Sequence, residues 1–472
     1  MDLSDVRKIY FIGIGGIGMS AAAGIAAEAG YEVAGSDSSA IYDPAKSVLD
    51  KFFISYHIGY DAANVKDAES DLYIASAGED RTNPEIAYLE DNDIPFYSFS
   101  ELLYELNQDR IRVVVTGTHG KSTTAGLIGH ILHNLDDSTF MTGAVLQFYQ
   151  TNFEYGSGHY AIFEGDEYKA LYNDPTPKFH LYKPDILVLT NLEYDHPDVF
   201  ENLAQLKHEF AELIANLPDD GLLIYNADDA NLAHLVHQTN VASFGFSLHN
   251  PSDYRAVNLQ FKPESTTFQV LRESEGERVW QEEYETRLAG EINVYNALGA
   301  IALLRALGFK REQIQEQLTT YEGVKRRLEL VGRTKSGITV YDDYAHHPTE
   351  VRETLAAART RYPNKTIWAV FEPHTYSRTE ATLDDLVKSF GDADHVLLAE
   401  IYPAREHKTA ESITGAAVIA AFRAAGSHNV QLVADKAAAF KVLQESAKPG
   451  DVVIIMAVGS FNTLASELTA QL

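Results

Sequence analysis

The 472-residue sequence contains no cysteine, and basic residues are scarce beside acidic ones. The absence of cysteine excludes disulfide bonds, zinc sites built on thiolates, and thiol nucleophiles. With 38 Lys and Arg against 68 Asp and Glu, the formal net charge is −30, which opposes binding to nucleic acid or to an anionic membrane. Anionic ligands must therefore be held by local loops and helix ends.

Long apolar runs are also missing. Residues 9–27 carry no charge, but five glycines interrupt them in a strand, turn and helix pattern, so we expect no membrane insertion. No basic start precedes a short apolar core with a small-residue cleavage site, so a cytoplasmic protein is expected. With 45% hydrophobic and 22% charged residues, the chain is globular and long enough for about three domains.

A glycine turn between a buried strand and a helix is the strongest functional signal. Residues 113–115 form a β-branched strand and residues 125–132 carry apolar side chains at helical spacing, so the segment between them must turn sharply. The amides of such a turn attract anions, and a lysine and a hydroxyl follow them directly. The turn consists of Thr116, Gly117, Thr118, His119, Gly120, Lys121, Ser122 and Thr123.

The spacing of this turn departs from the general GxxxxGK[ST] loop, because Val115 stands where the first glycine should be. We interpret it as a shortened phosphate loop that binds a nucleoside triphosphate. An ordinary strand-to-helix turn with a surface lysine is the alternative.

A second glycine turn lies near the start of the chain. It follows a strand expected at residues 9–12, and the next strand, at residues 32–34, is followed closely by Asp37. This GxGxxG arrangement is typical of a βαβ unit that binds a dinucleotide or another sugar nucleotide. Glycines that serve only close packing are the alternative. The turn comprises Gly13, Ile14, Gly15, Gly16, Ile17, Gly18 and Met19.

Acidic clusters follow two further strands. Residues 164–167 come after the strand expected at 160–163, and residues 191–196 come after the strand expected at 186–190. At the carboxyl edge of one sheet, these carboxylates and an imidazole are suited to holding Mg²⁺. Solvated loops are the alternative for each cluster taken singly. Between them, residues 169–183 are expected to form a loop lying over the site.

Strand-helix alternation throughout predicts three α/β domains, at residues 1–107, 108–322 and 323–472. In the first domain a strand is expected at residues 94–97. In the second, a helix from Asn293 carries amides that could hydrogen-bond a base, with helix capping as the alternative. In the third, strands expected at 338–341 and 367–371 are followed by segments rich in His and Arg.

Taken together, these segments resemble the motifs of the Mur ligases of peptidoglycan synthesis. The resemblance covers the whole chain in the right order. It implies a Rossmann-like domain for a UDP-sugar, a central P-loop ATPase domain, and a C-terminal Rossmann-like domain for an amino acid. The segments that carry it are residues 13–19, 116–123, 164–167, 191–196, 323–327, 341–348 and 373–378.

The resemblance implies an ATP- and Mg²⁺-dependent amide-bond ligase of cell-wall biogenesis, which supports cell shape and division. ATP would phosphorylate the lactyl carboxylate of UDP-N-acetylmuramate, and the amine of L-alanine would attack the acyl phosphate. Lys121, Arg and Mg²⁺ would stabilise the transferring phosphoryl group, and domain closure would exclude water. A monomer or a homodimer is expected.

Site residues follow by matching positions. The nucleotide would contact the turn 117–123 together with Asn296, Arg327 and Asp342. Mg²⁺ would be held by Ser122, Glu167 and His196. The sugar nucleotide would lie against Gly15, Gly16, Ile17, Gly18, Met19 and Asp37, while His347, His374 and Arg378 would line the site for the muramyl carboxylate and the amine. Lys121, Glu167, His196, His347 and Arg378 are the expected catalytic set.

Two departures from the family pattern stand out. Many relatives have His-Asn where this chain has Ile292-Asn293. Residues 168–184 are longer than usual in the alanine-adding type and resemble the murein-peptide-recycling ligase, which attaches a tripeptide to the same sugar nucleotide. Residues 13–19, 373–378 and 400–404 favour alanine. An NAD-dependent oxidoreductase and a non-catalytic nucleotide switch are the rivals from other classes, and the oxidoreductase leaves Lys121 without a role.

Overall fold

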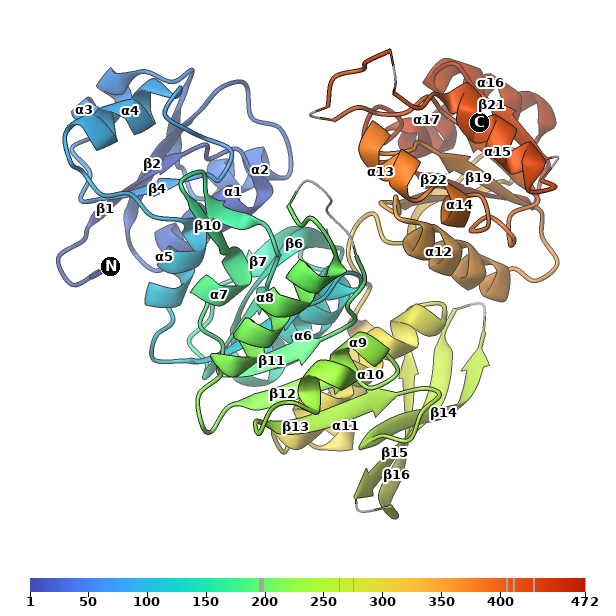
Figure 1. The fold of residues 1–472 in the computed structure, drawn as a ribbon, viewed down its shortest axis with the longest axis horizontal. Coiled ribbons are helices and arrows are strands. Elements are labelled where there is room, and N and C mark those ends of the chain that lie inside the picture. Colours follow the sequence, from blue (N-terminus) through green and yellow to red (C-terminus); the bar gives the residue numbers. More distant parts are fainter. Residues whose placement is uncertain are drawn as a thin grey trace.

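Three α/β domains follow one another along the chain. The computed structural model describes residues 1–194, 199–262, 264–274, 276–404, 406–410, 412–427 and 429–471. The first domain (blue) and the third (orange to red) stand on opposite sides above the second, which runs from cyan to yellow (Figure 1). Among the described residues, no helix combines the length and the apolarity that a membrane crossing requires.

The first domain is built on a parallel sheet with strand order β3-β2-β1-β4. Its central strand is apolar and buried along most of its length, as expected where helices cover both faces. The elements are β1 (Lys8–Ile12), α1 (Ile17–Glu28), β2 (Glu32–Asp37), α2 (Ala45–Lys51), β3 (Ser55–Ile58), α3 (Ala62–Ala68), β4 (Leu72–Ala75), α4 (Pro84–Asp91) and α5 (Phe99–Glu105).

The strand expected at residues 94–97 is wrong. Only Tyr97 pairs, in an isolated bridge to Ile74 of β4. Pro95 has no N–H to donate to a ladder, so the segment runs beside the sheet without joining it.

The second domain has a ten-stranded sheet with order β16-β15-β14-β13-β12-β11-β5-β8-β6-β7. Its parallel centre carries the phosphate loop, while β14, β15 and β16 add an antiparallel extension that the sequence reasoning missed (Figure 1). The first elements are β5 (Ile111–Thr116), α6 (Lys121–Asp136), β6 (Thr139–Leu146), β7 (Thr151–Glu154), β8 (Tyr160–Glu164), β9 (Lys169–Leu171), β10 (Asp174–Pro177), α7 (Lys178–Leu181) and β11 (Ile186–Leu189). The rest are α8 (Leu203–Ala215), β12 (Leu222–Asn226), α9 (Ala230–Val236), β13 (Ala242–Ser247), β14 (Tyr254–Phe261), β15 (Thr266–Ser274), β16 (Glu277–Thr286), α10 (Glu291–Ala306) and α11 (Arg311–Thr320).

The third domain has a six-stranded sheet with order β17-β18-β22-β19-β20-β21, parallel except for β17. The elements are β17 (Glu329–Arg333), β18 (Thr339–Asp343), α12 (Pro348–Arg361), β19 (Ile367–Phe371), α13 (Tyr376–Ala381), α14 (Leu383–Leu386), β20 (His395–Leu398), α15 (Gly415–Ala424), β21 (Val430–Leu432), α16 (Lys436–Ser446), β22 (Val452–Met456) and α17 (Leu464–Gln471). The predicted boundary after residue 107 falls between α5 and β5, and that after residue 322 falls between α11 and β17.

The loop expected over residues 169–183 is instead a hairpin, β9–β10, followed by the short helix α7. Leu171 in this hairpin is buried in an apolar cluster with Tyr10, Ile86 and Leu89 of the first domain. The second domain thus inserts a side chain into the core of the first.

The first two domains share an apolar core, whereas the third domain has cores of its own. One cluster joins first-domain residues such as Ile25 to second-domain residues such as Met141 and Phe153. The clusters of the third domain consist of its own residues. Apolar packing therefore holds the first two domains together, whereas among the described residues of the third domain only Val324, next to the boundary, belongs to the apolar cluster of the second.

Candidate functional site

The phosphate loop lies between β5 and α6, and glycine is required at both of its turns. Gly117 has φ of +139°, and a Cβ there would lie 2.2 Å from Oγ1 of Thr190. Gly120 has φ of +79°, and a Cβ there would lie 2.5 Å from Oδ1 of Asn296. The backbone is therefore packed between β11 and α10, with its amides at the N-terminus of α6, where anions bind.

Lys121 and Ser122 begin α6 beside the first acidic cluster. Nζ of Lys121 lies 3.1 Å from Glu167 and donates to the carbonyl of Gly117 at 2.7 Å. Burial opposes the charge of Lys121, but Glu167 and Glu164 outweigh it and raise the pKa of the amine. Oγ of Ser122 donates to Glu164 at 2.9 Å. A cation and a hydroxyl thus meet two carboxylates at the mouth of the loop.

This oxygen-rich set fits Mg²⁺. Hydroxyl and carboxylate oxygens are the ligands that Mg²⁺ prefers, and they leave room for waters and phosphate oxygens. Ser122 and Glu167, two of the predicted ligands, lie here; the third, His196, lies outside the described residues. Glu164 is a further candidate ligand, which the sequence reasoning placed in the cluster without assigning it a role.

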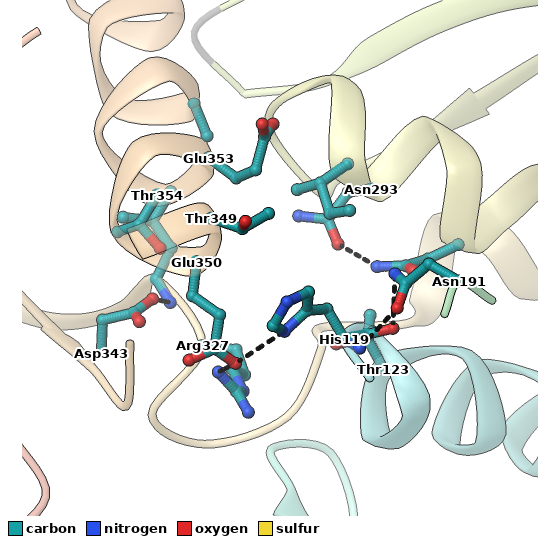
Figure 2. A pocket seen from close by; sticks show the side chains of 15 residues that line it. His119, Thr123, Asn191, Asn293, Arg327, Asp343, Thr349, Glu350, Glu353 and Thr354 are labelled. Atoms are coloured by element: carbon teal, nitrogen blue, oxygen red, sulfur yellow. Dashed lines mark hydrogen bonds and ion pairs between the residues drawn. The ribbon is translucent and has the colours of Figure 1, made fainter. Parts of the chain in front are cut away.

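The loop faces the third domain across a cleft (Figure 2). His119 and Thr123 come from the loop side, Asn191 follows β11, and Asn293 lies on α10. The opposite wall is α12 with the segment before β17, which supplies Arg327. The remaining residues that line the cleft are Gly120, Ile292, Asn296, Leu328, Asp343, Thr349, Glu350, Glu353, Thr354 and Ala357.

The predicted nucleotide residues differ in their surroundings. Asn296 lines the cleft, accepts from Thr124 at 3.2 Å and donates to Asn293 at 3.0 Å. Asp342 does not line this cleft: it pairs with Arg326 at 3.1 Å, and its neighbour Asp343 is the lining residue. Alternate residues of a strand face opposite sides, so a contact between Asp342 and the nucleotide stays a prediction.

His119 is buried between carboxylates of two domains. Its Nε2 lies 3.3 Å from Glu193, and its Nδ1 lies 3.7 Å from Glu350 on α12. Burial opposes protonation, yet the two carboxylates raise the pKa of His119 to about 9, while the same contact with His119 lowers the pKa of Glu193 to about 2. His119 is therefore an imidazolium at neutral pH.

His347 stands beside this ion pair, its ring centroid 5.0 Å from that of His119. His119, Glu193 and His347 each offer a ligand atom within 4.8 Å of the others, so the geometry alone would admit a metal ion. The chemistry disfavours it, because His119 is protonated and Nδ1 of His347 accepts from the amide of Thr349 at 3.3 Å. We interpret the group as an ion-pair contact.

The glycine turn of the first domain is closed by Asp37. The amide of Gly15 donates to Oδ2 of Asp37 at 2.8 Å, and a Cβ on Gly15 would lie 2.7 Å from the same oxygen. Nearby, Asn152 of the second domain donates to the carbonyl of Ile17 at 3.3 Å, and Gly18 lies against Phe99. The turn is thus fixed against the second domain; Gly16 and Met19 belong to the same turn and the start of α1.

His374 and Arg378 line a second cleft that all three domains contribute to. Nη1 of Arg378 donates to Nδ1 of His374 at 2.7 Å. The first domain supplies residues 76–78 after β4, and the β9–β10 hairpin region supplies Lys169 and Lys178. These two predicted substrate residues thus face the first domain.

Known proteins match the chain along its whole length. The description "Mur ligase family, catalytic domain" matches residues 8–110, "Mur ligase middle domain" residues 115–304, and "Mur ligase, glutamate ligase domain" residues 326–459. A UDP-N-acetylmuramate–L-alanine ligase of Clostridium acetobutylicum is 37% identical over 408 residues, which is 85% of each chain. The chain belongs to the Mur ligase family.

Solved Mur ligase structures agree. The UDP-N-acetylmuramate–alanine ligase of Thermotoga maritima superposes with a TM-score of 0.80 at 25% identity over 98% of both chains. A murein peptide ligase of Psychrobacter arcticus gives 0.71 at 27% identity, also over 98% of both chains. The predicted three-domain Mur ligase fold is confirmed.

In this Mur ligase, sequence reasoning found the loop but missed its partners across the domain contact. Glu193 and Glu350 pair with His119, yet neither was singled out as a site residue. Glu193 stands two residues after Asn191, within a recognised motif, so the motif itself could have drawn attention to it. Glu350 offers only the capping-box spacing after His347, which predicts a helix start and no site.

Proposed function

We propose that this Mur ligase joins L-alanine to UDP-N-acetylmuramate in the cytoplasm, with ATP and Mg²⁺, in peptidoglycan biosynthesis. The main observation in support of this function is the position of two clefts. One lies between the phosphate loop and α12, and the other lies between the first domain and the Arg378 segment. Relatives named for this reaction support it. The oxidoreductase and switch alternatives lose their basis, because the family is one of ligases.

The loop side of the site would hold the triphosphate. Amides at the start of α6 would face the phosphates, and Lys121 would exchange its contacts with Gly117 and Glu167 for the transferring phosphoryl group. Charge that develops on this group during transfer is stabilised by cations fixed around it. Ser122, Glu167 and His196 would hold Mg²⁺, and the bound ion would supply positive charge that neutralises the phosphates.

The second cleft would hold the muramyl carboxylate and the amine. Arg378 offers a planar guanidinium that suits a carboxylate or an acyl phosphate. The contact between Nη1 of Arg378 and Nδ1 of His374 orients the two side chains toward each other at this cleft. The glycine turn of the first domain, closed by Asp37, would hold the UDP group.

A tripeptide-adding ligase is the second candidate. The observation that favours it is the β9–β10 hairpin at the second cleft, in a segment that resembles the recycling enzyme, together with the likeness to a murein peptide ligase structure. Alanine remains our proposal, because the relative with 37% identity is an alanine ligase.

A product assay tests both candidates. The protein is incubated with ATP, Mg²⁺, UDP-N-acetylmuramate and either L-alanine or the tripeptide, and the product is weighed by mass spectrometry while phosphate is measured. We expect the mass of the alanine adduct, and phosphate release that needs both the sugar nucleotide and the amine. A product formed only from the tripeptide would establish the second candidate. Phosphate release that ignores both substrates would contradict ligation altogether. The oligomeric state, monomer or homodimer, stays a prediction for light scattering.

A further inference from the structure

Basic side chains converge on the carboxylate of Glu350. Nη1 of Arg327 lies 3.0 Å from Oε1, and Nδ1 of His119 lies 3.7 Å from the same oxygen. Nδ1 of His346 lies 3.4 Å from Oε2. The Glu350 side chain is only 10% exposed, so these contacts are little screened by water.

These contacts cross the boundary between two domains. His119 belongs to the phosphate loop, whereas Glu350 and Arg327 belong to the third domain (Figure 2). A second contact runs in parallel, because Oγ1 of Thr349 on α12 donates to Glu193 at 2.9 Å. No described residue of α12 belongs to the apolar cluster of the second domain, so these polar contacts connect α12 to the loop.

Glu350, Arg327 and His119 are the charged members of this group. Coulombic attraction to Arg327 and His346 outweighs burial and holds the pKa of Glu350 well below its usual range. Burial opposes the charge of Arg327 too, but Glu350 raises its pKa. Removing one member of a buried charged group leaves the others unpaired, which is strongly unfavourable.

Glu350 itself is held rigidly. It is the third residue of α12, and Oε2 accepts the backbone amides of His346 at 3.1 Å and His347 at 3.4 Å. A long arginine side chain has many rotamers, so a fixed carboxylate beside it reduces the entropy lost when it binds a phosphate. The same carboxylate faces His119, whose backbone forms part of the loop.

We propose that Glu350 is a positioning residue for phosphoryl transfer: it aims Arg327 at the phosphate site and ties it to His119 of the loop when the third domain docks. The inference rests on the proposed function, because it assigns Arg327 to the nucleotide phosphates. Glu350 touches no substrate itself and acts through these two cations. Docking of the third domain would therefore place Arg327 at the phosphate site at the same time.

Glu350→Gln tests this in the full-length protein, because glutamine keeps the shape and can still accept the amides of α12. We expect kcat to fall roughly tenfold or more, since Arg327 is no longer fixed, while KM for UDP-N-acetylmuramate changes less than about twofold, because its UDP group would be held by the first domain and its carboxylate by the Arg378 cleft, away from Glu350. The alkaline limb of the pH profile of kcat should move to lower pH. His119 loses one of its two carboxylate partners in this variant, which lowers the pKa of the imidazole. Glu350→Asp, which keeps the charge, should restore the alkaline limb toward that of the unmodified protein.

Glu101→Gln is the matched control, because Glu101 holds the equivalent capping position of α5 and bonds Ser98. It should leave kcat and its pH profile unchanged. A second readout is the affinity for ADP by calorimetry, which should weaken in Glu350→Gln and not in Glu101→Gln.

The outcomes separate the two proposals. If the unmodified protein makes no ligation product, the proposed function fails. If it does, and Glu350→Gln keeps its kcat and ADP affinity, the positioning role is wrong. Suppose that kcat falls equally in Glu350→Gln and Glu101→Gln and that the alkaline limb does not move. Glu350 would then act only as a helix cap, and the inference would be overturned.

Discussion

The hydroxyl of Ser122 donates a hydrogen bond of 2.9 Å to Glu164, and the amide of Gly143 donates to the other carboxylate oxygen at 2.5 Å. Burial raises the pKa of Glu164, but Lys121 and these donors counteract the effect. The carboxylate therefore orients Ser122, the residue expected to meet Mg²⁺ from the loop. Variants of Ser122 and of Glu164 can distinguish a side chain that binds Mg²⁺ from a side chain that only orients it.

We expect Ser122→Ala to raise the Mg²⁺ concentration needed for half-maximal activity by roughly tenfold or more, because a predicted ligand oxygen is lost. Glu164→Gln should raise it less if Glu164 only orients the hydroxyl. The measurement is phosphate release against Mg²⁺ at saturating ATP. Equal Mg²⁺ dependence in Ser122→Ala and the unmodified protein would remove Ser122 from the metal site.

Lys121→Met should lower kcat by about 100-fold or more, because the fixed cation beside the transferring phosphoryl group is lost. The side chain is 13% exposed, and methionine keeps most of its volume, so circular dichroism should show an intact fold. Lys66→Met, on the exposed face of α3, serves as the control and should keep full activity. A fully active Lys121→Met variant would count against the phosphate loop itself.

The sequence could predict the parts of the site that are local. Gly117 and Gly120 stand between a strand and a helix, and that pattern alone predicts an anion-binding turn. The partnership of His119 with Glu350 could not be predicted, because more than two hundred residues separate them and only the docking of two domains brings them together. Residue spacing carries no information about such a contact.

In the fold, too, local features could be predicted from the sequence and features that depend on tertiary contacts could not. Alternating strands and helices predicted the parallel sheets, since each element has its own hydrophobic period. The sequence predicted a loop in place of the β9–β10 hairpin, because the strands are only three and four residues long and β10 contains two prolines. Its strands form because Leu171 is buried against the first domain, a tertiary reason that no local pattern contains.

The His119 ion pairs predict a pH dependence of stability. The pKa of His119 is about 9 in the folded protein against 6.5 for the free residue, so its contribution is fully present below pH 6.5 and is lost as the pH rises through 9. Glu193→Gln removes one partner and should flatten the fall in Tm between pH 6.5 and 9.5. His57→Gln, at an exposed position of the first domain, should leave the fall unchanged. Identical slopes in all three proteins would show that His119 is not charged.

Leu171 predicts how the first domain unfolds. Its side chain is 7% exposed and lies among Tyr10, Ile86 and Leu89, although it belongs to the second domain. Leu171→Ala should destabilise the protein by about 2–4 kcal/mol through lost burial and a residual cavity. Because the lost contacts hold one domain to another, hydrogen exchange should accelerate in β1 and β4 more than in the sheet of the third domain. Leu330→Ala, at a position 57% exposed, is the control and should change stability little. If Leu171→Ala instead leaves exchange in β1 and β4 unchanged, the hairpin covers the first domain without supporting it, and the contact is not what couples the two domains.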